Sequence, residues 1–220
     1  MVQPKTLRVK FEKTGKLQYI SHLDLLRTMQ TALRRAKVKM IYSEGFNPHM
    51  KITFALPLSI GIESVCEFMD IKTEGSVQPS YVKDNLGKNL PADMKIVDVY
   101  EVETKLTEVK YAEYMIYLDF KEQSERAAEI GQRLFGDTLI VTKRTKKGEK
   151  EVDISPMIKS VSCSFEYGMT MIKAVLCADS ENYLNPFYLT GALENALGSQ
   201  AEHKKVVRTN TYFENEKQFS

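Results

Sequence analysis

The sequence is short of cysteine, and its three cysteines are widely spaced. Cys66, Cys163 and Cys177 are odd in number among 220 residues, and no two of them form a CxxC pair. This pattern argues against a disulfide framework, a zinc knuckle and a conventional iron–sulfur cluster. We expect the three side chains to be small buried groups in a protein of a reducing compartment.

Long apolar runs and the common catalytic motifs are also missing. No stretch approaches the roughly 18 apolar residues of a membrane helix, and the opening residues 1–10 are no signal peptide. We therefore expect a cytoplasmic protein with no membrane partner. The sequence has no Gly-rich phosphate loop, HExxH, GxSxG or dinucleotide fingerprint, so we expect no cofactor and no metal.

The net charge of +2 hides a strong asymmetry along the chain. Residues 1–58 contain 11 basic and 3 acidic side chains, a local net charge of +8. Residues 59–105 contain 5 basic and 9 acidic side chains. A basic segment of this size favours a polyanionic partner such as a nucleic acid.

The order of the predicted elements indicates an α+β domain over residues 1–105. The patterns predict strands over 7–11, 38–42, 52–56, 64–73 and 95–103, and helices over 21–36 and 78–88. Ser21 stands at the expected cap of the first helix, with Asp24 three residues later in a variant capping box. The order is close to a ferredoxin-like βαββαβ unit with one additional short strand.

A similar order restarts near residues 104–108, which predicts a second ferredoxin-like domain over residues 106–220. The patterns predict strands over 111–120, 138–142, 151–154 and 204–213, a hairpin over 159–177, and helices over 122–135 and 186–197. The halves share no residue-level repeat, so the shared order carries the argument. The expected fold class is therefore α+β, with two ferredoxin-like domains side by side and antiparallel sheets.

The first predicted helix places basic side chains on one face. Its apolar residues recur at helical spacing, and Arg27, Arg34 and Arg35 fall on the opposite, solvent-facing side. A row of guanidinium groups suits contact with a phosphate backbone, and a solvated helix face is the structural alternative. His22 falls with the apolar stripe, which favours a packed first-turn histidine over a catalytic base.

A loop over residues 42–51 gathers groups that suit RNA recognition. Gly45 permits a positive φ and Pro48 holds the preceding residue extended, so we expect a rigid loop. The loop presents an aromatic ring, an amide, an imidazole and an ammonium group from Phe46, Asn47, His49 and Lys51. Such a set can stack on a base, read its edge and contact a phosphate. The structural alternative is a turn with Phe46 in the core.

A second basic segment covers residues 143–150 in the other predicted domain. Its candidate nucleic-acid contacts are Lys143, Arg144, Lys146 and Lys147. We expect a mobile cationic loop that is either simply solvated or part of a shared phosphate-binding surface.

Several motifs together carry a resemblance to a known family. They are YISHLDL at 19–25, ALRRA at 32–36, YSEGFNPH at 42–49, PLSIGIES at 57–64 and the stretch 142–154. The sequence resembles a bacterial family of radical-SAM-associated domains of unknown function, and departs from it at Met50, where a second proline is common. The resemblance implies a radical SAM protein as partner. The chain itself lacks the CxxxCxxC that ligates a radical SAM cluster.

Three functions stay open at this point. The first is a non-catalytic RNA-binding or substrate-presenting module that assists a radical SAM enzyme. The second is a metal-independent RNA-processing enzyme with His22 or His49 as general acid or base. The third is a protein-interaction adaptor that binds no nucleic acid.

Overall fold

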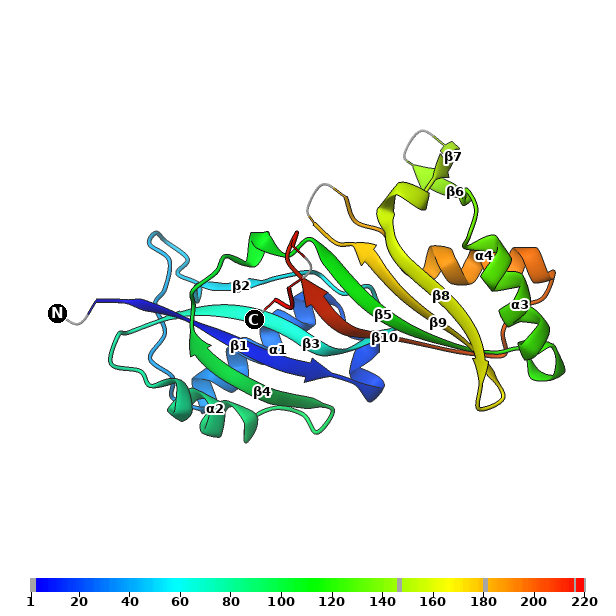
Figure 1. Ribbon diagram of the computed structural model, residues 1–220. Coiled ribbons are helices and arrows are strands. Elements are labelled where there is room, and N and C mark those ends of the chain that lie inside the picture. Colours follow the sequence, from blue (N-terminus) through cyan, green and yellow to red (C-terminus); the bar gives the residue numbers. More distant parts are fainter. Residues whose placement is uncertain (1–2, 146–147, 180–181, 216, 220) are drawn as a thin grey trace. The chain divides into compact units, whose positions relative to one another are not determined.

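The computed structural model describes residues 3–145, 148–179, 182–215 and 217–219 (Figure 1). The chain divides into two compact units, one up to Glu108 and the other over Val109–Phe219. Both mix helices with antiparallel strands, so the predicted α+β class is confirmed. No helix among the described residues combines the length and apolar character that a membrane crossing needs.

The first unit holds one antiparallel sheet and two helices. Its elements are β1 (Lys5–Lys13), η1 (Gly15–Tyr19), α1 (His22–Arg35), β2 (Ile52–Phe54), β3 (Ile62–Thr73), α2 (Pro79–Gly87), β4 (Met94–Glu101) and η2 (Leu106–Glu108). β1 lies between β4 and β3, and β2 pairs with β3. The strand predicted over 38–42 is wrong, because this segment makes only two isolated bridges, from Met40 to Thr73 and from Tyr42 to Met50.

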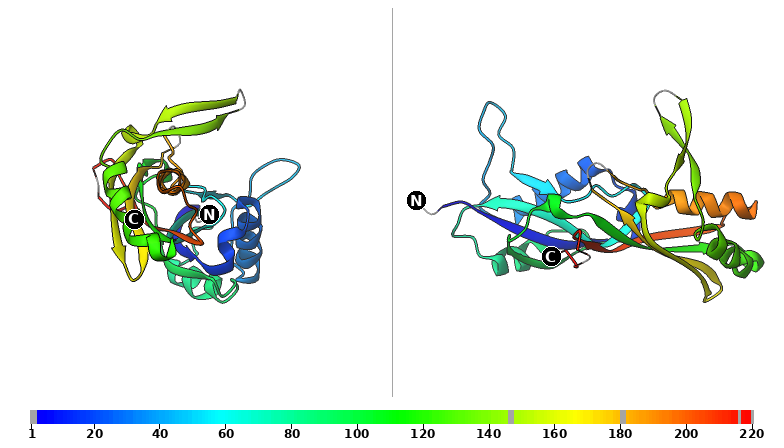
Figure 2. Two further views of the ribbon diagram at one scale, coloured as in Figure 1. Left: turned by 90° about the vertical axis from the view of Figure 1, so that its right-hand side faces the viewer. Right: turned by 45° about the horizontal axis from the view of Figure 1, so that its top comes forward.

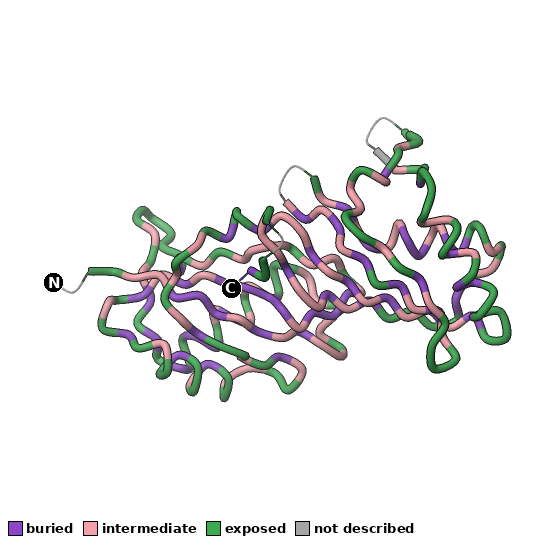
Figure 3. Tube along the Cα trace, in the orientation of Figure 1, coloured by how far each residue is buried: buried purple, intermediate pink, exposed green. Residues whose placement is uncertain are grey.

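The alternation of side chains separates the two faces of this sheet. Leu7 of β1 lies opposite Ile71 of β3, and both are fully buried in one core with residues of α1 and α2. The next pair in register, Thr6 and Lys72, points to the other face because successive residues of a strand alternate. Figure 3 shows this alternation of burial along the strands. One face of the sheet is therefore covered by helices. The opposite face carries Thr6, Asp70 and Lys72 toward one end of the strands, and the buried Cys66 and Phe68 further along β3.

Helix α1 begins at the predicted cap. The Asp24 N–H donates to Ser21 Oγ over 3.1 Å, and the Ser21 hydroxyl donates to the Asp24 carboxylate over 2.7 Å. These two bonds form the variant capping box expected from the sequence. Leu25 and Leu33 lie on the buried side of the helix, which fixes its rotation against the sheet.

The second unit repeats the alternation of strands and helices. Its elements are β5 (Tyr111–Asp119), η3 (Lys121–Gln123), α3 (Ser124–Leu134), β6 (Ile140–Thr145), β7 (Gly148–Asp153), η4 (Ser155–Met157), β8 (Ile158–Glu166), β9 (Met169–Cys177), α4 (Phe187–Leu197) and β10 (His203–Tyr212). The strands of its sheet run in the order β10-β5-β9-β8. β8 and β9 form the hairpin predicted over 159–177 and are joined at Tyr167 and Gly168, which both have positive φ, 53° and 77°.

The strands on either side of the predicted basic loop run further into it than the patterns over 138–142 and 151–154 indicate, since β6 reaches Thr145 and β7 begins at Gly148. β6 and β7 form a separate two-stranded sheet that extends from the unit (Figure 2). Lys143 lies opposite Lys150, and Arg144 opposite Glu149. Lys143, Arg144 and Lys150 are therefore held on paired strands.

Helix α3 approaches β8 closely at a buried glycine. A Cβ atom at Gly131 lies 2.6 Å from Cys163 Sγ, so only a residue without a side chain allows this approach. The Gln132 side-chain amide donates to the Cys163 carbonyl over 3.0 Å and secures the same contact. Burial raises the pKa of the Cys163 thiol to about 11, so this group stays protonated and unreactive at neutral pH.

We predict that Gly131→Ala lowers the free energy of unfolding by about 1–3 kcal/mol, because the added methyl group overpacks the contact with Cys163. Urea denaturation measures the change. The double variant Gly131→Ala, Cys163→Ala recovers part of the loss, since it removes the clashing sulfur. Gly191→Ala in α4 is the control, because nothing lies within 4 Å of a Cβ there. Equal losses at both glycines contradict the packing argument.

Candidate functional site

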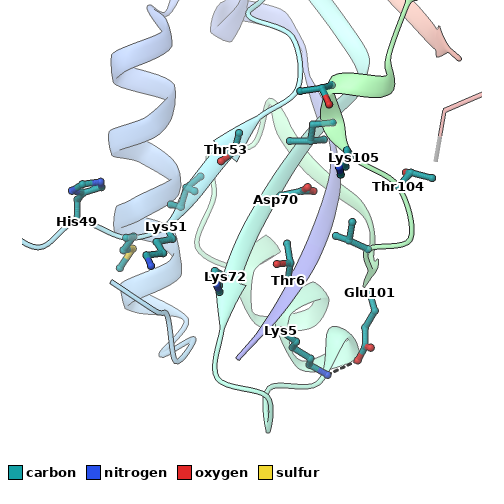
Figure 4. A pocket seen from close by; sticks show the side chains of 15 residues that line it. Lys5, Thr6, His49, Lys51, Thr53, Asp70, Lys72, Glu101, Thr104 and Lys105 are labelled. Atoms are coloured by element: carbon teal, nitrogen blue, oxygen red, sulfur yellow. Dashed lines mark hydrogen bonds and ion pairs between the residues drawn. The ribbon is translucent and has the colours of Figure 1, made fainter. Parts of the chain in front are cut away.

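A groove of about 920 Å³ lies mainly on the polar face of the first sheet. Its residues come from β1, from β2 and the residues just before it, from β3, and from the segment that follows β4 (Figure 4). Its charged lining residues are Lys5, Lys51, Asp70, Lys72, Glu101 and Lys105, and His49 lies at one side. Hydroxyl groups come from Thr6, Thr53, Thr104 and Thr107.

Both carboxylates in the groove are paired with basic side chains. Asp70 meets Arg8 in a two-pronged ion pair, with Nε to Oδ1 at 2.8 Å and Nη2 to Oδ2 at 3.1 Å. Glu101 meets Lys5 at 2.6 Å. Neither carboxylate therefore adds net negative charge to the groove.

The same arginine also fixes one wall of the groove. Arg8 is fully buried, and its guanidinium donates to Thr104 Oγ1 over 2.8 Å and to the Thr104 carbonyl over 2.6 Å. These bonds hold the segment after β4 against the sheet. The nearby Tyr100 phenol keeps its proton, because burial raises its pKa to about 12.

Three lysines in the groove carry uncompensated charge. Among the residues that the structure describes, no carboxylate lies within ion-pair distance of the ammonium groups of Lys51, Lys72 and Lys105. The Lys72 N–H donates to the Lys51 carbonyl over 3.0 Å, so these two residues are direct neighbours. Lys105 comes from the wall that Thr104 anchors (Figure 4). The groove is therefore a site of concentrated positive charge.

The loop over residues 43–49 projects from the first unit (Figure 2). Its two ends are tied together, since the Ser43 N–H donates to the His49 carbonyl over 2.8 Å and the His49 N–H to Ser43 Oγ over 3.1 Å. Ser43 Oγ also lies 2.9 Å from His49 Nδ1. Gly45 has φ 112°, which suits glycine. Phe46 has a relative exposure of 113%, so the alternative that placed it in the core is wrong.

The basic face of α1 lies away from this groove. Arg27, Arg34 and Arg35 are exposed, as predicted, and Arg27 has a weak contact with Asp24 at 3.5 Å. Arg27 and Arg35 line a separate depression of about 490 Å³ on the helical side of the unit. The structure thus brings His49 and Lys51 into one groove, and leaves the three arginines outside it.

His22 does not line the groove either. It is exposed at the start of α1, and its ring meets the Phe54 ring edge-on with centroids 5.2 Å apart. The sequence expectation of a packed residue is therefore only partly met, because the imidazole packs on one ring and otherwise faces solvent.

In the second unit, Lys143 has a local structural contact. Its Nζ lies 5.2 Å from the Tyr188 ring centroid and 3.9 Å from Met157 Sδ, which holds the β6–β7 hairpin against α4 and η4. The side chain of Arg144, together with Lys146 and Lys147, lies outside the described residues.

Sequence reasoning missed three lysines of the groove, namely Lys5, Lys72 and Lys105. Lys72 alternates with buried neighbours along β3, which marks it as facing away from the core. Only strand register shows that it meets Thr6 and Lys51, and register is not encoded in the local pattern. Among the described residues no group of three His, Cys, Asp or Glu side chains forms a metal site.

The fold and the groove together define an α+β protein with a basic, hydroxyl-lined recess on an open sheet face. The family described as "Uncharacterized protein conserved in bacteria (DUF2344)" matches residues 6–186. Because this match covers most of the sequence, the chain belongs to that family. A search of curated proteins finds no match.

Solved structures with related arrangements align over 93% of this chain at low identity. One, from a "Cbf5-Nop10-Gar1 Complex", has 8% identity and a TM-score of 0.47. This chain spans about half of its length, since the alignment covers 48% of it. Another, an "Unknown Protein from Galdieria sulphuraria", has 9% identity, a TM-score of 0.27 and 96% of its chain aligned. Neither TM-score is high enough to carry an argument about fold or function.

We predict that Asp70→Ala lowers the free energy of unfolding by about 3–5 kcal/mol, because it leaves the buried Arg8 guanidinium without its counter-charge. Asp98→Ala is the matched control, since Asp98 pairs with Lys83 at 3.0 Å on the surface. We expect Asp98→Ala to lower the free energy of unfolding by less than about 1 kcal/mol. Urea denaturation compares the two variants, and similar small losses refute the structural role of the Arg8 pair.

Proposed function

We propose that this chain is an RNA-binding module that takes a single strand in the groove and on the loop tip. The observation that carries the proposal is the juxtaposition in one unit of three unpaired lysines and a fully exposed Phe46. The lysines supply phosphate contacts, which provide most of the sequence-independent affinity for nucleic acids. The aromatic ring supplies a stacking surface for an unpaired base.

The placement of the groove supports a single strand as the ligand. Thr6 on β1 and Lys72 on β3 are paired in register and alternate with the buried Leu7 and Ile71, so the sheet sets the positions of this hydroxyl and this ammonium group. Some RNA-binding sheets carry the aromatic rings on which splayed bases stack. No Phe or Tyr among the described residues lines this groove, so the exposed ring on the 43–49 loop takes that part in the proposal. The tied ends of the 43–49 loop reduce the conformational entropy that Phe46 loses on binding.

We further propose that each unit is a variant of the ferredoxin-like fold. The element order β-α-β-β-α-β in the first unit and its strand order β4-β1-β3-β2 support this assignment. The second unit has the corresponding order β10-β5-β9-β8, with the β6–β7 hairpin inserted after α3.

The partner in this proposal is a radical SAM protein, to which the module presents its RNA. The family resemblance of the motifs over residues 19–25 and 42–49 supports this partner. The three cysteines of this chain are too widely spaced to ligate the radical SAM cluster, so the chemistry belongs to the partner.

A second candidate function is RNA cleavage with His49 as general acid or base. The observation in its favour is that His49 and Lys51 line the same groove. Cleavage by acid–base catalysis normally takes two groups, and His22 does not line the groove, so binding without cleavage is favoured. Incubation of labelled RNA with wild type and with His49→Ala tests this function. Cleavage by the wild type that is lost in His49→Ala supports catalysis by His49.

We predict that Lys51→Glu and Lys72→Glu each weaken binding to a labelled single-stranded RNA by about tenfold or more, because each reverses a phosphate contact. Fluorescence anisotropy at several salt concentrations measures the affinity. The slope of log K against log salt falls by about 1 for each lysine. Lys88→Glu makes the same charge change outside the groove and is the control. Equal losses of RNA affinity in all three variants indicate a general electrostatic effect and contradict the assignment of RNA binding to the groove.

We predict that Phe46→Ala weakens binding by roughly 5- to 150-fold, the range for loss of one stacked base, and leaves the salt slope unchanged. Tyr167→Ala is the control, because Tyr167 is a 92% exposed aromatic residue in the second unit. Wild-type affinity in the Phe46 variant excludes base stacking at the loop tip.

A further inference from the structure

The charge of the groove suits a ligand that concentrates negative charge in a few groups. Arg8 neutralises Asp70, and Lys5 neutralises Glu101, so these four groups add no net charge. The ammonium groups of Lys51, Lys72 and Lys105 leave about three positive charges around one recess. Each phosphodiester carries a single negative charge, so an internal segment matches this charge only with three phosphodiesters in one recess, whereas a strand end needs fewer phosphate groups.

We propose that the groove takes the phosphorylated end of an RNA strand. A terminal phosphomonoester carries about two negative charges at neutral pH, and the adjoining phosphodiester carries one. Together they match the three lysine ammonium groups. The inference rests on the proposed RNA binding and adds the chemical group that the groove selects.

The neutral lining of the groove fits the same ligand. A terminal phosphate has three oxygens that accept hydrogen bonds, and the Thr6 and Thr53 hydroxyls line the recess beside the lysines (Figure 4). The register places Thr53 opposite Asp70 and Thr6 opposite Lys72, so both hydroxyls stand on the polar sheet face. Charge-assisted bonds from ammonium groups to phosphate oxygens are among the stronger hydrogen bonds in proteins.

The size of the groove agrees with a terminal nucleotide. Its volume of about 920 Å³ lies in the range of roughly 300–1,000 Å³ for pockets that enclose a small ligand. His49 lines one side of the groove and is the last residue of the 43–49 loop, which carries the exposed ring of Phe46. Phe46 is therefore the aromatic surface that this loop offers to a base adjoining the bound phosphate. One strand end thus occupies both the groove and the loop tip.

The test compares three RNA oligonucleotides of one sequence, each about ten nucleotides long and labelled on an internal base. One carries a 5′-phosphate, one a 3′-phosphate, and one has hydroxyl groups at both ends. We expect one phosphorylated strand to bind at least about tenfold more tightly than the strand with two hydroxyl ends. The first two strands distinguish the 5′ from the 3′ end as the source of the phosphate.

Lys51→Ala and Lys72→Ala are expected to abolish the preference for the phosphorylated end, whereas Lys88→Ala retains it. Lys51 is exposed, so its variant keeps the fold even if Lys72→Ala does not, and thermal unfolding checks both. Equal affinity for all three strands overturns the end-recognition proposal and leaves RNA binding standing. A preference that persists in both lysine variants also overturns it. Failure of every strand to bind refutes the proposed function itself.

Discussion

The candidate site depends on one buried ion pair, between Arg8 and Asp70. Arg8 is fully buried, and its guanidinium reaches both the carboxylate of β3 and the hydroxyl and carbonyl of Thr104. A buried guanidinium is stable only when its donors are satisfied, so the chain after β4 must return to the sheet at this point. That return creates the wall carrying Lys105, and the pairing cancels the negative charge that Asp70 would bring to the groove. Shape and charge of the groove therefore have a common origin.

Around this pair, local rules set most of the geometry. Alternation on β1 and β3 sends apolar groups toward the helices and polar groups toward the open face. The capping box at Ser21 starts α1, and the bonds between Ser43 and His49 close the neck of the loop. Each feature is short-range, yet together they give one unit a basic recess and, on the loop that ends at His49, an exposed aromatic ring. This is why a chain without a familiar catalytic motif still presents a defined ligand surface.

The sequence predicted those features whose signal is local. The capped helix α1, the turn at Tyr167 and Gly168, and the loop over residues 43–49 follow from residue type and spacing alone, whereas the sequence left open whether Phe46 lies on the loop surface or in the core. Lys72 and Lys105 were missed because strand register and the return of the chain after β4 decide their positions. The strands predicted over 138–142 and 151–154 stop short of the observed ends of β6 and β7, because β7 has no buried residue and lacks the apolar alternation by which strands are recognised.

The fully exposed ring of Phe46 has a calorimetric consequence. An aromatic side chain held in water by a closed loop keeps its entire hydration shell in the free protein, and in the proposed RNA complex it loses that shell because a base covers the ring. Burial of apolar surface makes the heat-capacity change of binding negative. Phosphate contacts by the lysines release counterions from the RNA and make the affinity depend on ionic strength. Temperature and salt therefore act on different parts of one interface, the loop tip and the groove.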